Sequence, residues 1–178
     1  MVASRFCYMA FLIDACTDCQ PACVATQVSK IVRHAIDNPG EERPEGELFI
    51  GQITKECVVF ESSDIMDPSC VMSNLLSVAG RFWQSALKIA TPNLTKRFKE
   101  TFATYLDYVI GEAKMRDTST FVTVDEFLIH RRECVASLPT LAIPAINLNI
   151  PPEAFENPVV KEIEKCAADM LLIDNVGF

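Results

Sequence analysis

Positive charge and uninterrupted apolar runs are both scarce in this sequence, and each shortage excludes a class of function. The 178 residues include 16 Lys and Arg against 24 Asp and Glu, which gives a formal net charge of −8 at pH 7. Binding to a nucleic-acid backbone relies on clustered Lys and Arg, so we expect no nucleic-acid partner. An anionic substrate would therefore need a local device such as a metal ion.

The apolar stretches are too short to cross a bilayer, since none approaches the ~20 residues that a membrane helix needs. Asp14 ends the first stretch, and Asp169 and Asp174 interrupt the last. The N-terminus lacks the charged, apolar and small-residue layout of a secretory signal, and the eight cysteines are unevenly spaced. We expect no membrane span and a reduced, cytoplasmic setting.

Helical periodicity recurs along the chain, whereas no segment shows the alternation and hairpin turns of a strand series. Predicted helices begin near the N-terminus, at Pro21, at Thr91, after Thr123 and at Asn157. The fold class is therefore all-α, a helical bundle or part of one. The expected details are a capping box of Thr123 with Glu126, and a bend or end at Pro139.

Three of these helices have predicted core faces. On the long helix that runs from Thr91 to about Met115, the stripe consists of Leu94, Phe98, Phe102, Tyr105 and Val109. On the last helix, it consists of Val159, Ile163, Cys166, Met170 and Ile173. The helix near the N-terminus has Phe6, Met9, Ala10 and Ile13 at the same kind of spacing.

Periodicity fails in one internal segment and stops abruptly at both ends. Residues 41–47 read as an exposed loop and 48–55 as amphipathic, but residues 56–80 match no element well. The chain opens inside a core-like helix and stops at Phe178 in mid-pattern. We expect one incomplete domain over residues 1–178, and we hypothesise that 56–80 and 176–178 are unspliced intron sequence.

A cysteine cluster near the N-terminus could bind zinc or act as a redox motif. Structural zinc wants four ligands, but Cys16, Cys19 and Cys23 have no second cysteine pair nearby and His34 is the only close histidine. A redox CxxC motif normally accompanies a βαβ unit, which an all-α pattern does not supply. We expect these cysteines to be small buried residues.

Polar residues at helix ends form a second candidate site. Asp14 and Asp18 are four residues apart and share a helix face, which suits Mg²⁺, although such pairs are also common at solvated helix ends. Arg131 and Arg132 could bind phosphate, or one could be solvated and the other salt-bridged. Asn175 could supply an amide oxygen to a metal or simply cap its helix.

These residues lie within a series of motifs that points to a family. The order IDACTD, RPEGE, RFWQSA, TFATYLDYV, VDEFLIHRRE, IPPEAFENPVV and AADMLLIDN resembles the class I terpene synthases of fungi, the sesquiterpene cyclases. The resemblance covers nearly the whole chain apart from residues 56–80. It implies a partial class I terpene synthase helical bundle.

The resemblance also implies a site for Mg²⁺. Asp14 takes the leading position of the aspartate-rich metal motif and Asp18 matches its last acid, whereas Ala15 replaces the acid usually found second. Asn175 takes the first position of a second motif, N-D-x-x-S-x-x-x-E, but Val176 replaces its Asp and the chain ends before its Ser and Glu. The resemblance therefore implies a metal site with fewer ligands than the family pattern.

The remaining implied roles concern the substrate. Arg132, with Arg131 beside it, would sense the diphosphate; Ala136 and Leu138 stand where Gly and Lys are common. Phe6 and Phe11 would line an apolar cavity, but they are equally good core residues.

The implied activity is Mg²⁺-dependent ionisation and cyclisation of a prenyl diphosphate, with C15 farnesyl diphosphate as our choice, and release of diphosphate. This chain could lack that activity as it stands. The alternative function is a non-catalytic helical interaction protein.

Overall fold

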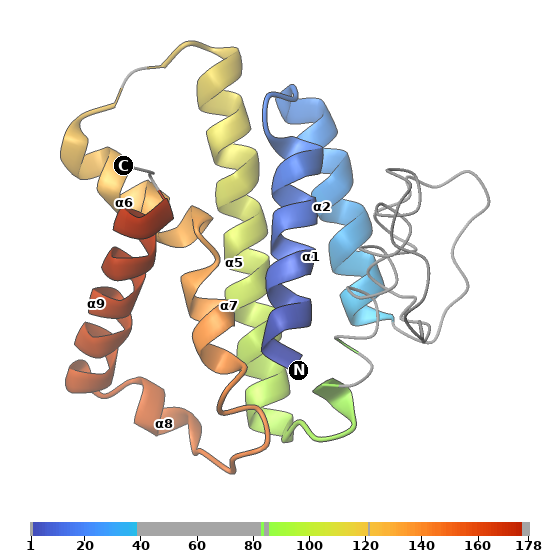
Figure 1. Cartoon of the computed structure of the whole chain (residues 1–178), viewed down its shortest axis with the longest axis vertical. Helices are drawn as coiled ribbons and strands as arrows, with labels where there is room; N and C mark the ends of the chain where they lie inside the picture. The colour runs from blue at the N-terminus through green and yellow to red at the C-terminus, as the bar shows by residue number, and fades with distance from the viewer. Residues whose placement is uncertain (1, 39–82, 84–85, 121, 176–178) are drawn as a thin grey trace, which may run out of the picture.

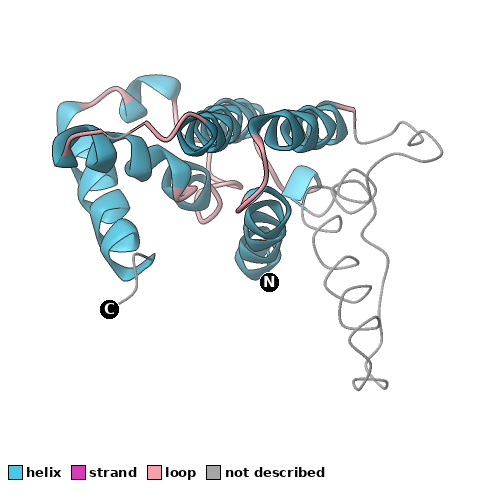
Figure 2. Cartoon of the chain, turned by 90° about the horizontal axis from the view of Figure 1, so that it is seen from above, coloured by secondary structure: helices cyan, strands magenta, loops and turns pink. Residues whose placement is uncertain are grey.

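The computed structural model describes residues 2–38, 83, 86–120 and 122–175. All regular secondary structure in these ranges is helical, which confirms the predicted all-α class (Figure 2). The helices are α1 (Val2–Thr17), α2 (Ala22–Asp37), α5 (Pro92–Asp117), α6 (Val124–Cys134), α7 (Ser137–Ala142), α8 (Pro152–Phe155) and α9 (Pro158–Asn175).

The long helix α5 occupies the centre of the bundle. It packs against α2, α6 and α7, while α1 packs against α2 and α7, and α9 packs against α6 and α7. Figure 1 shows α1 and α2 on one side of α5, and α6, α7 and α9 on the other. Side chains at the last turns of α1 and along α6 can therefore meet across α5.

The predicted core stripe of α5 is confirmed. Its five residues are all buried, and its aromatic members stack along the helix, with ring centroids 5.5 Å apart for Phe98 and Phe102. Trp83 stacks on Phe98 at 4.7 Å, and Phe6 of α1 meets Phe98 edge-on at 5.7 Å. Large aromatic side chains bury much apolar area, so this stack holds α1 against α5.

The predicted helix starts are correct, but the capping groups are partly different. The Thr123–Glu126 capping box is present, and the Asn157 Oδ1 accepts a hydrogen bond from the backbone N–H of Val159 at 2.9 Å. At the start of α5, the hydroxyl of Thr91 does not cap the helix and instead donates to the carbonyl of Leu148 at 3.0 Å.

The predicted break at Pro139 is wrong. Helix α6 ends at Cys134, and Ala136 adopts the left-handed conformation with φ of 55°, which separates α6 from α7. Pro139 lies in the first turn of α7, where a backbone N–H has no partner within the helix, so the ring is tolerated. The resemblance puts glycine at position 136, and glycine adopts this conformation without the steric cost that alanine bears.

The predicted core face of α9 is also wrong. Ala168 and Leu172 are buried, whereas all five residues of the predicted stripe, Val159, Ile163, Cys166, Met170 and Ile173, are exposed. The inward face of α9 carries acids that form ion pairs, Glu164 with Arg97 and Asp169 with Arg132. The periodicity predicts that the more apolar face of α9 is buried, but the ion pairs hold the opposite face against the bundle, so the apolar face points outward.

Several predictions fall on residues that the structure does not describe. The loop at 41–47, the amphipathic segment 48–55, the aperiodic segment 56–80 and residues 176–178 lie outside the described ranges. These remain predictions.

The corrected orientation of α9 predicts a contrast between two neighbouring residues. Leu172 is 4% exposed and Ile173 is 56% exposed, so Leu172→Ala should lower the free energy of unfolding by about 2–3 kcal/mol through loss of buried apolar contact. Ile173→Ala should change it by less than about 0.5 kcal/mol. Urea unfolding followed by circular dichroism measures both, and a larger loss for Ile173→Ala would contradict this orientation.

Candidate functional site

Asp14 is held at the last turn of α1 by a group of the core. It is half-buried, and its Oδ1 accepts a hydrogen bond of 2.9 Å from the hydroxyl of Tyr105 on α5. A buried tyrosine hydroxyl needs a partner, and Asp14 supplies it. Asp18 follows α1 directly and is exposed, and its backbone N–H donates to the carbonyl of Asp14 at 2.6 Å.

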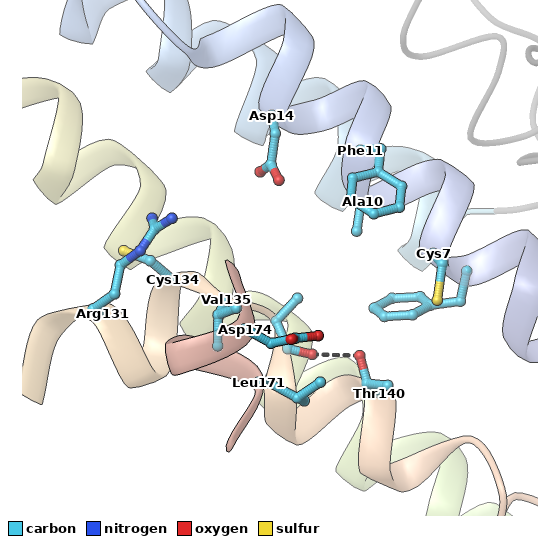
Figure 3. A pocket seen from close by; sticks show the side chains of 12 residues that line it. Cys7, Ala10, Phe11, Asp14, Arg131, Cys134, Val135, Thr140, Leu171 and Asp174 are labelled. Atoms are coloured by element: carbon cyan, nitrogen blue, oxygen red, sulfur yellow. Dashed lines mark hydrogen bonds between the residues drawn. The ribbon is translucent and has the colours of Figure 1, made fainter. Parts of the chain in front are cut away.

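Two cavities meet beside Asp14. One, of about 350 Å³, has Asp14, Asp18, Glu112, Arg116 and Arg131 among its lining residues. The other, of about 310 Å³, is mostly apolar and includes Phe6, Ala10, Phe11, Leu171, Asp14 and Asp174 in its lining (Figure 3). Asp14 and Arg131 belong to both linings, so a charged ligand group and an apolar ligand chain could lie on either side of them.

The surroundings of Asp14 disfavour its charged form. The pKa of this carboxyl is raised to about 6, mainly by burial and to a smaller extent by the nearby charges of Asp18 and Glu112. The hydrogen bond from Tyr105 and the charge of Arg131 lower the pKa but do not cancel the effect of burial. A cation bound here would stabilise the charged form of Asp14.

The two adjacent arginines lie in different places. Arg131 lines both cavities beside Asp14, and its Nη1 lies 3.5 Å from Oε2 of Glu112. Arg132 forms an ion pair with Asp169 and lines a third cavity, of about 450 Å³, with Arg97 and Phe155. The structure therefore brings together Asp14, Asp18 and Arg131, and it leaves Arg132 outside that group.

The remaining predicted residues divide between the cavity and the undescribed parts. Phe6 is fully buried, Phe11 is 64% exposed, and both line the apolar cavity. Asn175 is the last residue of α9, and its side chain lies outside the described part of the structure. Its neighbour Asp174 lines the apolar cavity.

The expected burial of the N-terminal cysteines is wrong. Cys16, Cys19 and Cys23 are exposed free thiols, because they fall on the outer side of α1, in the following turn and at the start of α2. Cys19 has a φ of 59°, so it lies in a turn rather than in a helix. Within the described residues, none of the three belongs to a cluster of donors close enough to share one metal ion.

Sequence reasoning missed three residues that build the site. The periodicity predicts Tyr105 only as a core residue, although a tyrosine in a stripe of phenylalanines signals a hydroxyl that needs a hydrogen-bond partner. Arg116 reaches from the end of α5 to the carbonyl of Thr17 at 3.0 Å, and Glu112 lies one turn earlier beside Arg131. Charges near the end of a long helix give no such signal, because most of them are simply solvated.

The donor set around Asp14 fits a hard divalent cation. The carboxylates of Asp14 and Asp18 line one cavity, and oxygen ligands are those that Mg²⁺ prefers. Arg131 adds a positive group suited to a phosphate oxygen. The arrangement can hold a metal with an anionic group on one side and an apolar group on the other.

A solved structure defines the class of fold. The SVS_A2 protein from ancestral sequence reconstruction superposes with a TM-score of 0.72 over 98% of this chain and 45% of its own, at 16% sequence identity. At that identity the likeness shows the fold alone. Within the described residues, no helix combines the length and the apolar character needed to cross a bilayer.

Sequence comparison identifies the family. The family model described as terpene synthase family 2, C-terminal metal binding, matches residues 5–175, so the chain belongs to this terpene synthase family. It is 35% identical to sesquiterpene synthase 14 and 33% identical to delta(6)-protoilludene synthase 18, both of Postia placenta. Each match covers 93% of this chain but only 40% of the relative.

The raised pKa of Asp14 predicts a pH-dependent cost in stability. The pKa of Asp14 is about 6 in the folded chain and 3.8 ordinarily, so the folded chain holds this proton more tightly than the unfolded chain. The resulting contribution to the free energy of unfolding is fully present below about pH 4 and is lost as the pH rises through 6. In metal-free buffer, Asp14→Asn should raise the free energy of unfolding by about 1–3 kcal/mol near pH 7 and leave it unchanged near pH 4.

Urea unfolding at several pH values between these limits measures the effect. Asp125→Asn is the matched control, because Asp125 is exposed on α6 and is not one of the charges that act on Asp14, so the loss of stability with rising pH that Asp14 causes should persist in this variant. Parallel pH profiles for Asp14→Asn and the unchanged chain would contradict the prediction.

Proposed function

We propose that this chain is part of a Mg²⁺-dependent terpene cyclase that acts on a prenyl diphosphate, with farnesyl diphosphate as substrate. The observation that carries the proposal is the position of Asp14 between a polar cavity shared with Asp18 and Arg131 and an apolar cavity. The sesquiterpene synthase names of its relatives support it. Those names belong to longer proteins, so the activity proposed is that of a whole enzyme.

The metal would be held by oxygen ligands. Asp14 and Asp18 would bind Mg²⁺, Asn175 would add an amide oxygen, and Ala15 removes one carboxylate that the family pattern provides. When bound, Mg²⁺ supplies positive charge that neutralises the diphosphate. Tyr105 keeps the Asp14 carboxylate directed to the cavity through its hydrogen bond.

The other residues of the site would position the substrate. Arg131 would donate hydrogen bonds to diphosphate oxygens, and the apolar cavity would hold the prenyl chain away from water. When the carbon–oxygen bond breaks, the electron pair leaves with the diphosphate and a carbocation remains on the chain. The ring faces of Phe6 and Phe11 could stabilise that positive charge during cyclisation to a sesquiterpene.

Arg132 has a less direct role in this arrangement. The resemblance makes it the diphosphate sensor, but its guanidinium is paired with Asp169. It would reach a diphosphate only after leaving that ion pair.

A second function, a non-catalytic helical interaction protein, has one observation in its favour. The apolar side chains of α9 that were predicted to be buried, such as Ile163 and Met170, are exposed at 63% and 73%. In that case the acids of the site would only solubilise the helices.

The domain assignment is a separate proposal. Residues 1–178 would form one incomplete catalytic domain, with residues 56–80 as an insertion foreign to the family. Sequencing of the mature transcript tests it: codons for 56–80 and a stop after Phe178 in the message would refute the intron hypothesis.

We predict that the 178-residue chain binds inorganic pyrophosphate only when Mg²⁺ is present, and that Asp14→Ala weakens this binding more than about tenfold, because a metal ligand is lost. Isothermal titration calorimetry measures the binding. In the complete enzyme, Asp14→Ala should abolish the release of diphosphate from farnesyl diphosphate and the formation of a hydrocarbon.

Cys16→Ala and Cys19→Ala are the matched controls, since both thiols are exposed in the same part of the chain, and both variants should retain most of the binding and activity. Similar losses from all three variants would argue against the metal assignment. An absence of Mg²⁺-dependent pyrophosphate binding, with no hydrocarbon product, would favour the interaction protein.

The separate positions of the two arginines predict a difference in diphosphate binding. Arg131→Ala should weaken binding of Mg²⁺ with pyrophosphate by about tenfold or more, because a charge-assisted hydrogen bond is lost. Arg132→Ala should have a smaller effect, since Arg132 lies in an ion pair with Asp169. The reverse order, measured by the same calorimetry, would show that Arg132 leaves Asp169 when the ligand binds.

A further inference from the structure

A second cluster of possible metal ligands borders the polar cavity, and its donors differ in kind from those of Asp14 and Asp18. Glu112 of α5 meets His130 and Cys134 of α6, and the donor atoms of the three side chains all lie within 4.8 Å of one another. We propose that these residues form a binding site for a zinc-type divalent cation. The site does not depend on the activity proposed above.

The imidazole of His130 is prepared to bind a metal through one nitrogen. Its Nε2 is buried and has no hydrogen-bond partner, whereas the ring makes a hydrogen bond to the backbone of Tyr108. Histidines that ligate a metal commonly bond a backbone carbonyl through their other nitrogen, which fixes the orientation of the ring. An unpartnered buried nitrogen costs free energy, and a metal ion would remove that cost.

Gly111 of α5 leaves room for the imidazole ring of His130. A Cβ built on Gly111 would lie 3.1 Å from Cε1 of His130, closer than most such contacts. The ring of Tyr108 packs against the imidazole at 5.0 Å between centroids. Glycine at position 111 therefore allows His130 to approach α5 beside Glu112.

The other two ligands complete a mixed set of nitrogen, sulfur and oxygen. Cys134 is 5% exposed and lies one turn after His130, so both point from the same face of α6. The thiol of Cys134 hydrogen-bonds the carboxylate of Glu112, so the two groups are already in contact. A tetrahedral zinc site has ligand separations of roughly 3.3–3.8 Å, which small side-chain movements would reach from this arrangement.

The donor types decide which metal fits. Imidazole and thiolate suit Zn²⁺ or Co²⁺, whereas Mg²⁺ prefers oxygen ligands in octahedral geometry. One thiolate and one carboxylate offset the double positive charge, which matters because Arg116 and Arg131 also approach Glu112. Three protein ligands leave the fourth position of a tetrahedron for water.

Titration of the metal-free chain with Co²⁺ tests the proposal directly. A thiolate bound to Co²⁺ gives a charge-transfer absorption band in the near ultraviolet, which oxygen-only sites lack. We expect one equivalent of Co²⁺ to produce this band, an equal amount of Zn²⁺ to remove it, and an excess of Mg²⁺ to leave it. A chain that develops no such band would overturn the proposal.

Ligand variants locate the site. Cys134→Ser should abolish the band, and His130→Asn and Glu112→Gln should weaken Zn²⁺ binding more than about tenfold in competition with a chromogenic chelator. The matched controls are the triple variant Cys16→Ser, Cys19→Ser, Cys23→Ser, the variant His34→Asn and the variant Glu100→Gln, all at exposed positions. Loss of the band in the triple variant with retention in Cys134→Ser would place the metal at the N-terminal cysteines and refute the proposal.

Gly111→Ala provides a test that does not remove a ligand. The added methyl group would crowd His130, so Zn²⁺ binding should weaken several-fold while the helix content by circular dichroism is unchanged. This variant serves if Cys134→Ser fails to fold. Unchanged Zn²⁺ affinity in folded Gly111→Ala and His130→Asn would show that His130 is not a ligand.

Discussion

The hydrogen bond between Tyr105 and Asp14 joins the core of this protein to its candidate site. The aromatic stack of α5 fixes Tyr105 within the bundle, and the tyrosine hydroxyl then fixes one oxygen of Asp14 at the end of α1. The same burial that makes this contact possible raises the pKa of Asp14. The packing around Tyr105 therefore determines both the position of the Asp14 carboxyl and its raised pKa.

The sequence predicts the helices well because helix periodicity and capping are local properties. The core stripe of α5 and the Thr123–Glu126 capping box are found as expected. The face of α9 was predicted wrongly, since its orientation depends on ion pairs with Arg97 and Arg132, which are distant in sequence. A pattern of apolar residues contains no information on such pairs.

For the candidate site, the sequence identifies the kinds of residue but not which of them meet. Asp14, Asp18 and Arg131 line one cavity, whereas Arg132, which the family resemblance implies as the diphosphate sensor, forms an ion pair with Asp169. Adjacent residues on a helix point in directions about 100° apart, so only one of two neighbouring arginines can face a given cavity. Tyr105 and Arg116 contribute through contacts across the bundle, which only the fold reveals.

The turn between α1 and α2 is held by hydrogen bonds to the C-terminal end of α5. Asp117 accepts a hydrogen bond from the backbone N–H of Ala22 at 2.8 Å, and Arg116 donates to the carbonyl of Thr17 at 3.0 Å. These bonds span 95 and 99 residues of chain. Contacts at such separation require a long loop to close, so the bonds that hold the segment carrying Asp18 depend on the docking of residues almost a hundred positions away.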